Sequence, residues 1–221
     1  MQKFLYHGTG YVALQAILKD GFIAPRGQRE GNWDPTIPSN PDAVYLTTVY
    51  SIFYANGASS NHDNRLVIIE VDRALLLDSK MAPDEDFLEQ ATRKGADPQV
   101  STVARVAQYR DRTRREFQAM WPSSLEHLGT CCYFGQIPIA AISRIAIIPR
   151  THPIALASDP IVCLPNHAVM GAYYRNLTKR VFGDVDYEQE VLPSAFAVAD
   201  IPRSGILVCS GATGEFEEVS D

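Results

Sequence analysis

Five histidines and four cysteines are the side chains of this sequence that most readily bind a metal or react as nucleophiles. The histidines show neither HxxxH nor HxH spacing and the cysteines form no CxxC pair, so the sequence predicts no metal site. It also lacks the GxSxG motif of serine hydrolases and the GxxxxGKS/T motif of phosphate-binding loops. One histidine, His7, is differently placed, because it directly follows the apolar run KFLY and precedes Gly8 and Thr9. His7 is therefore the first candidate for a functional side chain.

The composition is that of an ordinary globular protein, with 46% hydrophobic residues, 21% charged residues and a formal net charge of −6. This acidic balance gives no general reason to expect nucleic acid or an anionic membrane as a partner. Basic residues cluster between residues 93 and 115, a pattern more typical of a solvated helix face than of a polyanion site. With no signal peptide and no apolar run of about 18 to 20 residues, we expect a cytoplasmic protein without a membrane partner. We expect its cysteines to be reduced and buried.

The elements around His7 follow one another quickly. A short strand over residues 3–6 should lead into an HGT loop, and apolar residues at helical spacing from Tyr11 predict a helix that ends at Gly21. Residues 22–43 contain four prolines and several Gly, Asn and Asp residues, which indicates a long irregular loop. The stretch AVYLTT then predicts a strand, and the next stretch, VYSIFYANGA, a short helix ended by its Asn-Gly pair.

The later part of the chain alternates strands and helices. RLVIIEVD, residues 65–72, is a nearly continuous apolar run and predicts a strand buried on both faces. Pro83 and the acidic stretch 84–86 predict a capped helix, and a longer helix should run from about residue 101 to Pro122. Two more strands are expected in TCCYFGQI and SRIAIIP. We expect an α+β fold, with one domain over residues 1–150 and an extension over residues 151–221 that completes this domain or is appended to it.

The order of these phrases resembles the ADP-ribosyltransferase superfamily. It is most similar to the His-Tyr-Glu branch, which contains the poly-ADP-ribose polymerases and the diphtheria-toxin-like enzymes. That branch has an HGS or HGT motif on its first strand, then a helix ending in an ILxxGL-like phrase, then a tyrosine-bearing strand. Here the three phrases are residues 7–9, ILKDGFI over residues 17–23, and Tyr45 to Thr47. The resemblance covers about residues 3–72 and implies an ADP-ribosyltransferase-like split central β-sheet with flanking helices.

The resemblance also implies roles for the HGT residues in binding NAD as a substrate. His7 would donate a hydrogen bond to a ribose hydroxyl, which a neutral imidazole can do. Gly8 would let its backbone approach the nicotinamide carboxamide, since a side chain there would block the approach. Thr9 would add a hydroxyl to the same set of contacts.

Two tyrosines complete the NAD site that the resemblance implies. Tyr45 and Tyr54 would sandwich the nicotinamide by stacking, which is worth roughly 0.5 to 1.5 kcal/mol for an aromatic pair. Arg26, in the long loop, would lie near the pyrophosphate. Cleavage of the bond between nicotinamide and ribose passes through an oxocarbenium-like state, which a carboxylate stabilises. A catalytic carboxylate is therefore required beside His7 and Tyr45.

The position of that carboxylate departs from the family pattern. The family carries a glutamate at the start of a later strand, here TCCYFGQI, which contains no acid. Glu126, four residues upstream of this strand, is the nearest candidate. If Glu126 does not reach the site, Thr130 or Gln136 stands where the family has glutamate, or another acid such as Glu70 acts instead. For the acids at residues 84–86, helix capping is the favoured interpretation.

The function implied by the resemblance is transfer of ADP-ribose from NAD to a macromolecular acceptor, either protein or nucleic acid. Compact members of this class include bacterial and phage toxins and effectors, which implies a neutralising or regulatory protein partner. RNA 2'-phosphotransferase shares the fold and the HGT motif, but Tyr45 favours nicotinamide stacking. The same resemblance is compatible with an NAD glycohydrolase and with a catalytically inactive nucleotide-binding module.

Overall fold

Helices and strands are interspersed along the chain, and the predicted α+β class is confirmed. The computed structural model describes residues 3–25, 27, 39–59, 64–92, 99–101, 104–105, 116–158, 167–188 and 198–220. The strands are β1 (Phe4–Gly10), β2 (Phe22–Ile23), β3 (Ala43–Thr47), β4 (Arg65–Asp72), β5 (Met81–Pro83), β6 (Thr130–Phe134), β7 (Ile137–Pro138), β8 (Ile142–Pro149), β9 (Leu207–Ser210) and β10 (Glu217–Glu218). The helices are α1 (Tyr11–Asp20), α2 (Ser51–Ser59), α3 (Glu85–Thr92), α5 (Trp121–His127), α6 (Pro153–Ala157) and α7 (His167–Phe182).

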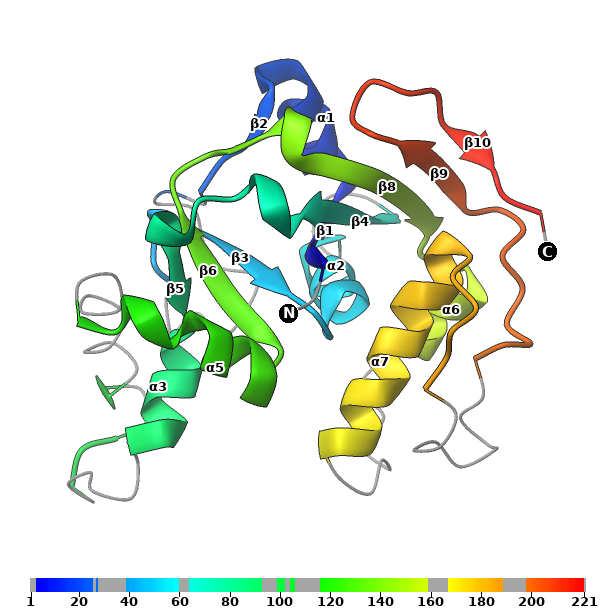
Figure 1. Ribbon diagram of the computed structural model, residues 1–221. Coiled ribbons are helices and arrows are strands. Elements are labelled where there is room, and N and C mark those ends of the chain that lie inside the picture. Colours follow the sequence, from blue (N-terminus) through cyan, green and yellow to red (C-terminus); the bar gives the residue numbers. More distant parts are fainter. Residues whose placement is uncertain are drawn as a thin grey trace.

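In the described part of the chain, eight strands form one antiparallel sheet in the order β10-β9-β8-β4-β1-β3-β6-β5. β1 pairs with β4 over its whole length, and β3 pairs with β6 over its whole length. β1 and β3, in contrast, are in register at Tyr6 and Thr47 alone among the described residues. Figure 1 shows α6 and α7 on one side of the molecule, α3 and α5 on the other, and α2 between them. The sheet is therefore joined most narrowly where His7 and Tyr45 lie.

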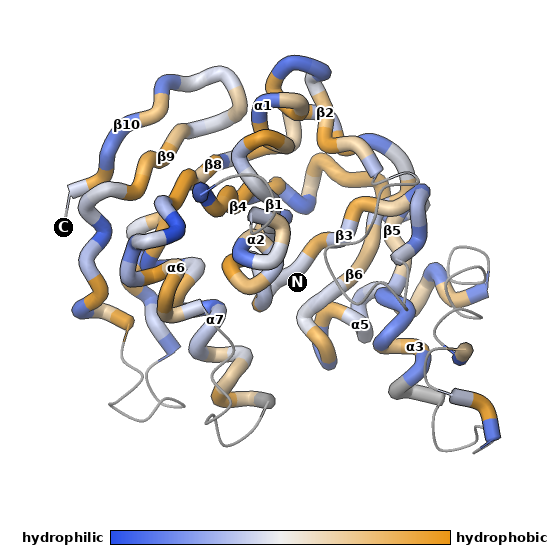
Figure 2. The backbone as a smooth tube through the Cα atoms, turned by 180° about the vertical axis from the view of Figure 1, so that it is seen from behind, coloured by the Kyte–Doolittle hydropathy of each residue, from blue (hydrophilic) through white to orange (hydrophobic). Residues whose placement is uncertain are grey.

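Two layers of apolar side chains cover the faces of β4. Val67 and Ile69 belong to one hydrophobic cluster, with α1, and Leu66 and Ile68 belong to another, with α2 and α7. All four side chains are fully buried. Figure 2 shows hydrophobic residues along the central strands. The prediction of a strand buried on both faces is confirmed, because a strand covered on both faces needs no polar alternation.

Three local predictions change in the structure. The HGT motif is not a loop, because β1 continues through it to Gly10. α2 does not end at its Asn-Gly pair but runs on to Ser59. Pro122 does not end a helix; it occupies the first turn of α5, where proline is favoured because the first helical N–H groups have no intrahelical partner. Gly21 does end α1 as predicted, with a left-handed φ of 83° and its N–H bonded to the Ile17 carbonyl.

Residues after 150 contribute to the same sheet and to its cover. β9 pairs with β8, and β10 pairs with β9. α7 packs against α2, and the Ser51 and Thr178 hydroxyls are hydrogen-bonded at 2.8 Å between these two helices. Within the described residues, no helix combines the length and the apolar character needed to cross a membrane.

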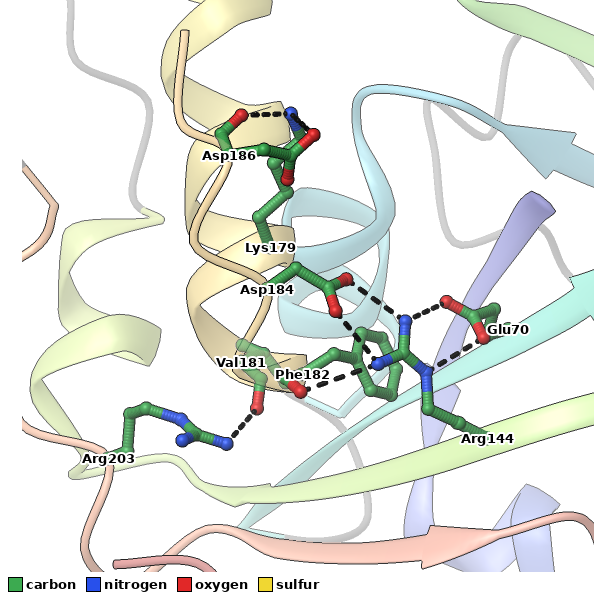
Figure 3. A network of polar contacts seen from close by, with 8 residues as sticks. All are labelled: Glu70, Arg144, Lys179, Val181, Phe182, Asp184, Asp186 and Arg203. Carbon is green, nitrogen blue, oxygen red and sulfur yellow. Dashed lines mark hydrogen bonds and ion pairs between the residues drawn. The ribbon is translucent and has the colours of Figure 1, made fainter. Parts of the chain in front are cut away.

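A partly buried ion-pair network joins the C-terminal end of α7 to the sheet (Figure 3). The Arg144 guanidinium on β8 bonds both oxygens of Glu70 on β4, at 2.8 and 2.5 Å. On its other side it bonds both oxygens of Asp184, at 3.1 and 3.0 Å, and it lies 4.5 Å from the centre of the Phe182 ring. We call Glu70, Arg144, Phe182 and Asp184 the Arg144 cluster. A cation near a helix C-terminus also interacts favourably with the negative end of the helix dipole. The cluster therefore anchors this end of α7.

Candidate functional site

His7 lies in the middle of β1, and its ring reaches across to β3. Its Nδ1 atom is 3.0 Å from the Tyr45 carbonyl oxygen, and because a carbonyl oxygen can only accept, Nδ1 carries the proton. Burial lowers the pKa of His7 below its ordinary value, against the opposing effect of this bond. The ring is therefore neutral, and Nε2 is a hydrogen-bond acceptor. A contact of His7 with a ribose hydroxyl stays a prediction, and in this tautomer the ring would accept that hydroxyl's hydrogen at Nε2.

The Tyr45 hydroxyl is held by a carboxylate for which the sequence favoured helix capping. It lies 2.6 and 2.8 Å from the two oxygens of Glu85, to which it donates, and it accepts the Asn40 N–H at 2.8 Å. Burial and the charge of Glu85 raise the pKa of Tyr45 well above its ordinary value. Glu85 is 4% exposed. Tyr45 thus links His7, through its backbone carbonyl, to the Glu85 carboxylate, through its hydroxyl.

Glu85 belongs to an acidic turn, defined here as Asp84, which links β5 to α3, together with Glu85 and Asp86 in the first turn of α3. Asp84 does cap α3, because its Oδ1 atom accepts the Asp86 N–H at 3.0 Å. Burial and the charges of the other two acids raise the pKa of Asp84 to about 8. Burial raises the pKa values of Glu85 and Asp86 as well. One acid is enough to cap a helix, and three crowded acids with raised pKa values are a frequent mark of a functional site.

Tyr54 lies on α2, beside the acidic turn. Its ring contacts the rings of Tyr50 and Phe53 edge-on, with centroids 6.2 and 5.8 Å apart. Burial and the charges of Asp84 and Asp86 raise its pKa above the ordinary value. The structure therefore brings Tyr54 to the same group, although the Tyr45 and Tyr54 rings do not touch each other. The sandwich of a nicotinamide ring between them stays a prediction.

Gly8 is required by the packing of α2. A β-carbon at this position would stand 2.1 Å from the Ser51 carbonyl oxygen and 2.7 Å from the Ala55 nitrogen. The missing side chain therefore lets α2, with Tyr54, lie directly on β1. Thr9, the next residue, is 7% exposed and buried in β1. Contacts of Gly8 and Thr9 with NAD remain predictions.

Glu126 has no polar contact with His7, Tyr45 or Tyr54 that would place it in the candidate site. It lies on α5 with an exposed side chain and makes no hydrogen bond or ion pair with His7, Tyr45 or Tyr54. Glu70 forms an ion pair with Arg144 in the Arg144 cluster. Thr130 is buried at the start of β6, and Arg26 lies outside the described residues. The carboxylates that the structure does place beside Tyr45 and Tyr54 are those of the acidic turn.

Sequence reasoning missed Glu85 because its position depends on strand pairing. Tyr45 on β3 is in register with Cys132 on β6, which is in register with Ala82 on β5. The acidic turn begins two residues after Ala82, so it lies near Tyr45 across two strand pairings. The available signal was three consecutive acids where one cap is needed.

The raised pKa of Asp84 predicts how the free energy of unfolding depends on pH. A carboxyl whose folded pKa exceeds its unfolded pKa loses stabilisation as pH rises from about 4 to about 8, because the folded state binds the proton more tightly. Replacing Asp84 with asparagine removes the charge and keeps a capping side chain. We expect Asp84→Asn to raise the free energy of unfolding by about 1 to 3 kcal/mol at pH 8, after allowance for partial exposure, and by less at pH 5.

Urea unfolding at pH 5 and pH 8 measures this difference. Asp72→Asn is the matched control, since Asp72 is also a capping aspartate and accepts the Ala74 N–H at 2.9 Å in an exposed position. We expect its effect to be small at both pH values. An Asp84→Asn effect that does not grow with pH would contradict a buried charge at this position.

Comparisons with known proteins add little to this geometry. No protein family and no curated protein matches the chain. Among solved structures, EcPltA superposes with a TM-score of 0.40 at 14% sequence identity, over 71% of this chain and 80% of that chain. Similarity at this level supports no conclusion about function.

Proposed function

We propose that this protein is an NAD-dependent ADP-ribosyltransferase of the His-Tyr-Glu type, which transfers ADP-ribose from NAD to a macromolecular acceptor. The observation that carries the proposal is the chain of contacts from the His7 ring to the Tyr45 carbonyl and from the Tyr45 hydroxyl to Glu85. It supports the proposal because it joins, on three separate elements, the three residue types that the reaction needs.

The proposal extends to the fold. We propose that the narrow joint between β1 and β3 is the split of an ADP-ribosyltransferase-like sheet. The His7 ring lies at this joint, and Gly8 allows α2 to bring Tyr54 against the same strand. A nicotinamide ring bound there would be close to aromatic faces and to carboxylates.

The residues suit the expected chemistry. As the bond from ribose C1' to the nicotinamide nitrogen breaks, its electron pair leaves with nicotinamide and positive charge develops on the ribose. Carboxylates of the acidic turn would stabilise this charge, and a partly buried site strengthens the effect. The neutral His7 ring would hold a ribose hydroxyl through Nε2. In this scheme the third-motif carboxylate comes from the acidic turn and not from Glu126.

The test uses NAD labelled on the phosphate next to adenosine, with the whole chain and a cell extract. We expect label in a macromolecule, and sensitivity to protease or nuclease identifies the acceptor as protein or nucleic acid. His7→Ala and Tyr45→Ala should each reduce transfer by at least about 100-fold. Glu126→Gln should retain it, because the Glu126 side chain is exposed.

Different outcomes would indicate different activities. Release of free ADP-ribose without transfer would instead indicate an NAD glycohydrolase. No turnover of NAD would contradict both enzymes, and phosphate transfer from a 2'-phosphorylated RNA would then indicate the phosphotransferase. Loss of transfer in Glu126→Gln would indicate that Glu126, the first candidate from the sequence, is the catalytic carboxylate.

A further inference from the structure

We propose that Asp84 and Glu85 have different tasks: Glu85 positions Tyr45, and Asp84 is the carboxylate that meets the substrate. This division rests on the proposed function, and it concerns two adjacent acids whose surroundings differ.

Glu85 is fully engaged by the protein. Both of its oxygens lie within 2.8 Å of the Tyr45 hydroxyl, and the Asn40 N–H donates to the Tyr45 hydroxyl and to this carboxylate. With the side chain 4% exposed, a ligand would have to displace these donors to reach it. Glu85 therefore fixes the plane and position of the Tyr45 ring, and it ties Tyr45 to the end of the long loop at Asn40.

Asp84 is held at its backbone and has more of its carboxylate free. Its N–H donates to the Ser124 hydroxyl at 3.0 Å, and that hydroxyl donates to the Thr130 carbonyl at 2.7 Å. Ser124 is completely buried, so α5 and β6 together fix where Asp84 stands. The Asp84 carboxylate accepts from the Asp86 N–H at Oδ1, and the nearby Thr130 hydroxyl lowers its pKa against the effect of burial, so most of its four lone-pair positions are not used by the protein. Unlike Glu85, Asp84 is partly exposed.

The position of Asp84 beside Thr130 accounts, within the proposal, for the missing glutamate. Thr130 begins the strand on which the family resemblance places the third-motif acid, and its side chain is a hydroxyl without a carboxylate. Asp84, at the end of the neighbouring strand β5, brings a carboxylate to that same point. The charge of Asp84 acts on Tyr54 of α2, so this carboxylate lies on the side where the nicotinamide would stack.

The proposed step is balanced as follows. The C1'–nitrogen bond breaks and its electron pair neutralises the pyridinium, so nicotinamide leaves as a neutral molecule. The acceptor's oxygen or nitrogen forms the new bond to C1', and its proton passes to the Asp84 carboxylate. In its ionised form, which predominates once the pH exceeds its pKa of about 8, Asp84 first stabilises the ribosyl cation and then takes this proton, which solvent removes afterwards.

Steady-state kinetics of NAD turnover and of label transfer test the division. Asp84→Asn should lower kcat about 100- to 1,000-fold with little change in the KM for NAD. Glu85→Gln and Tyr45→Phe should mainly raise KM, since the Tyr45 ring is retained but less well held. If Glu85 acts through the Tyr45 hydroxyl, the double variant should be no worse than either single one.

Controls keep the result interpretable. Asn is as good a cap as Asp, so Asp84→Asn should fold, which thermal unfolding verifies. Asp84→Glu, which restores a displaced carboxylate, should recover part of kcat, and Asp72→Asn should keep full activity. An active Asp84→Asn, or a Glu85→Gln with kcat lost and KM unchanged, would overturn the division. A wild-type chain without NAD turnover would contradict the proposed function itself.

Discussion

Gly8→Ala is expected to reduce the free energy of unfolding by about 3 kcal/mol, because overpacking of this kind displaces rigid neighbours. The new β-carbon would stand 2.1 Å from the Ser51 carbonyl oxygen and 2.7 Å from the Ala55 nitrogen, both of which are backbone atoms of α2. No side-chain rotation can relieve these overlaps, so the helix itself must move away from β1. Because α2 carries Tyr54, the variant should also bind NAD more weakly.

Gly10→Ala is the matched control for this prediction. Gly10 lies two residues along β1 on the same face, and a β-carbon there would be 3.4 Å from the Ala58 carbonyl oxygen, an ordinary contact. Its backbone is extended, which any residue adopts. We expect Gly10→Ala to change stability by about 0.5 kcal/mol or less. Chemical unfolding of both variants measures the difference, and equal stabilities would mean that Gly8 does not determine how α2 packs.

The sequence allowed prediction of those elements whose signals are local. The nearly continuous apolar run 65–72 is β4, and the glycine after the α1 pattern is its left-handed C-cap. The HGT motif was misread as a loop because glycine usually interrupts strands, whereas here Gly8 and Gly10 make room for α2. Pro122 was read as the end of a helix because proline breaks helices, although it is equally suited to begin one.

The candidate site divides in the same way. His7 and Tyr45 were proposed because the order of the motifs that carry them resembles a known family, and the NAD site that this resemblance implies stays a prediction. Glu85 was missed because it meets Tyr45 only through the pairing of β3 with β6 and of β6 with β5. Glu126 was favoured because it is close to β6 in the sequence, but α5 directs its side chain to solvent. Proximity along the chain was misleading where the sheet determines proximity in space.

Arg144→Met is expected to reduce the free energy of unfolding by about 3 to 5 kcal/mol, because it leaves a buried carboxylate without its partner. Glu70 has a side chain only 1% exposed and receives two bonds from the Arg144 guanidinium. Asp184 would lose the same cation, and the end of α7 would lose the anchor that Figure 3 shows. Urea unfolding of the variant measures the loss.

Two further variants decide whether burial causes that loss. Glu70→Met combined with Arg144→Met removes both charges, and it should recover most of the stability because no buried ion is left unpaired. Asp186→Asn breaks the 3.1 Å ion pair that Asp186, beyond the end of α7, makes with Lys179 of α7, but the Asp186 side chain is 80% exposed. It should cost less than about 1 kcal/mol. If Arg144→Met costs no more than Asp186→Asn, or if the double variant recovers nothing, the Arg144 cluster does not anchor α7 by charge. A large single loss with recovery in the double variant would establish that the sheet and α7 are coupled through Glu70. Glu70 is the register partner of Tyr6, and Tyr6 is the β1 residue paired with β3 at the joint beside His7.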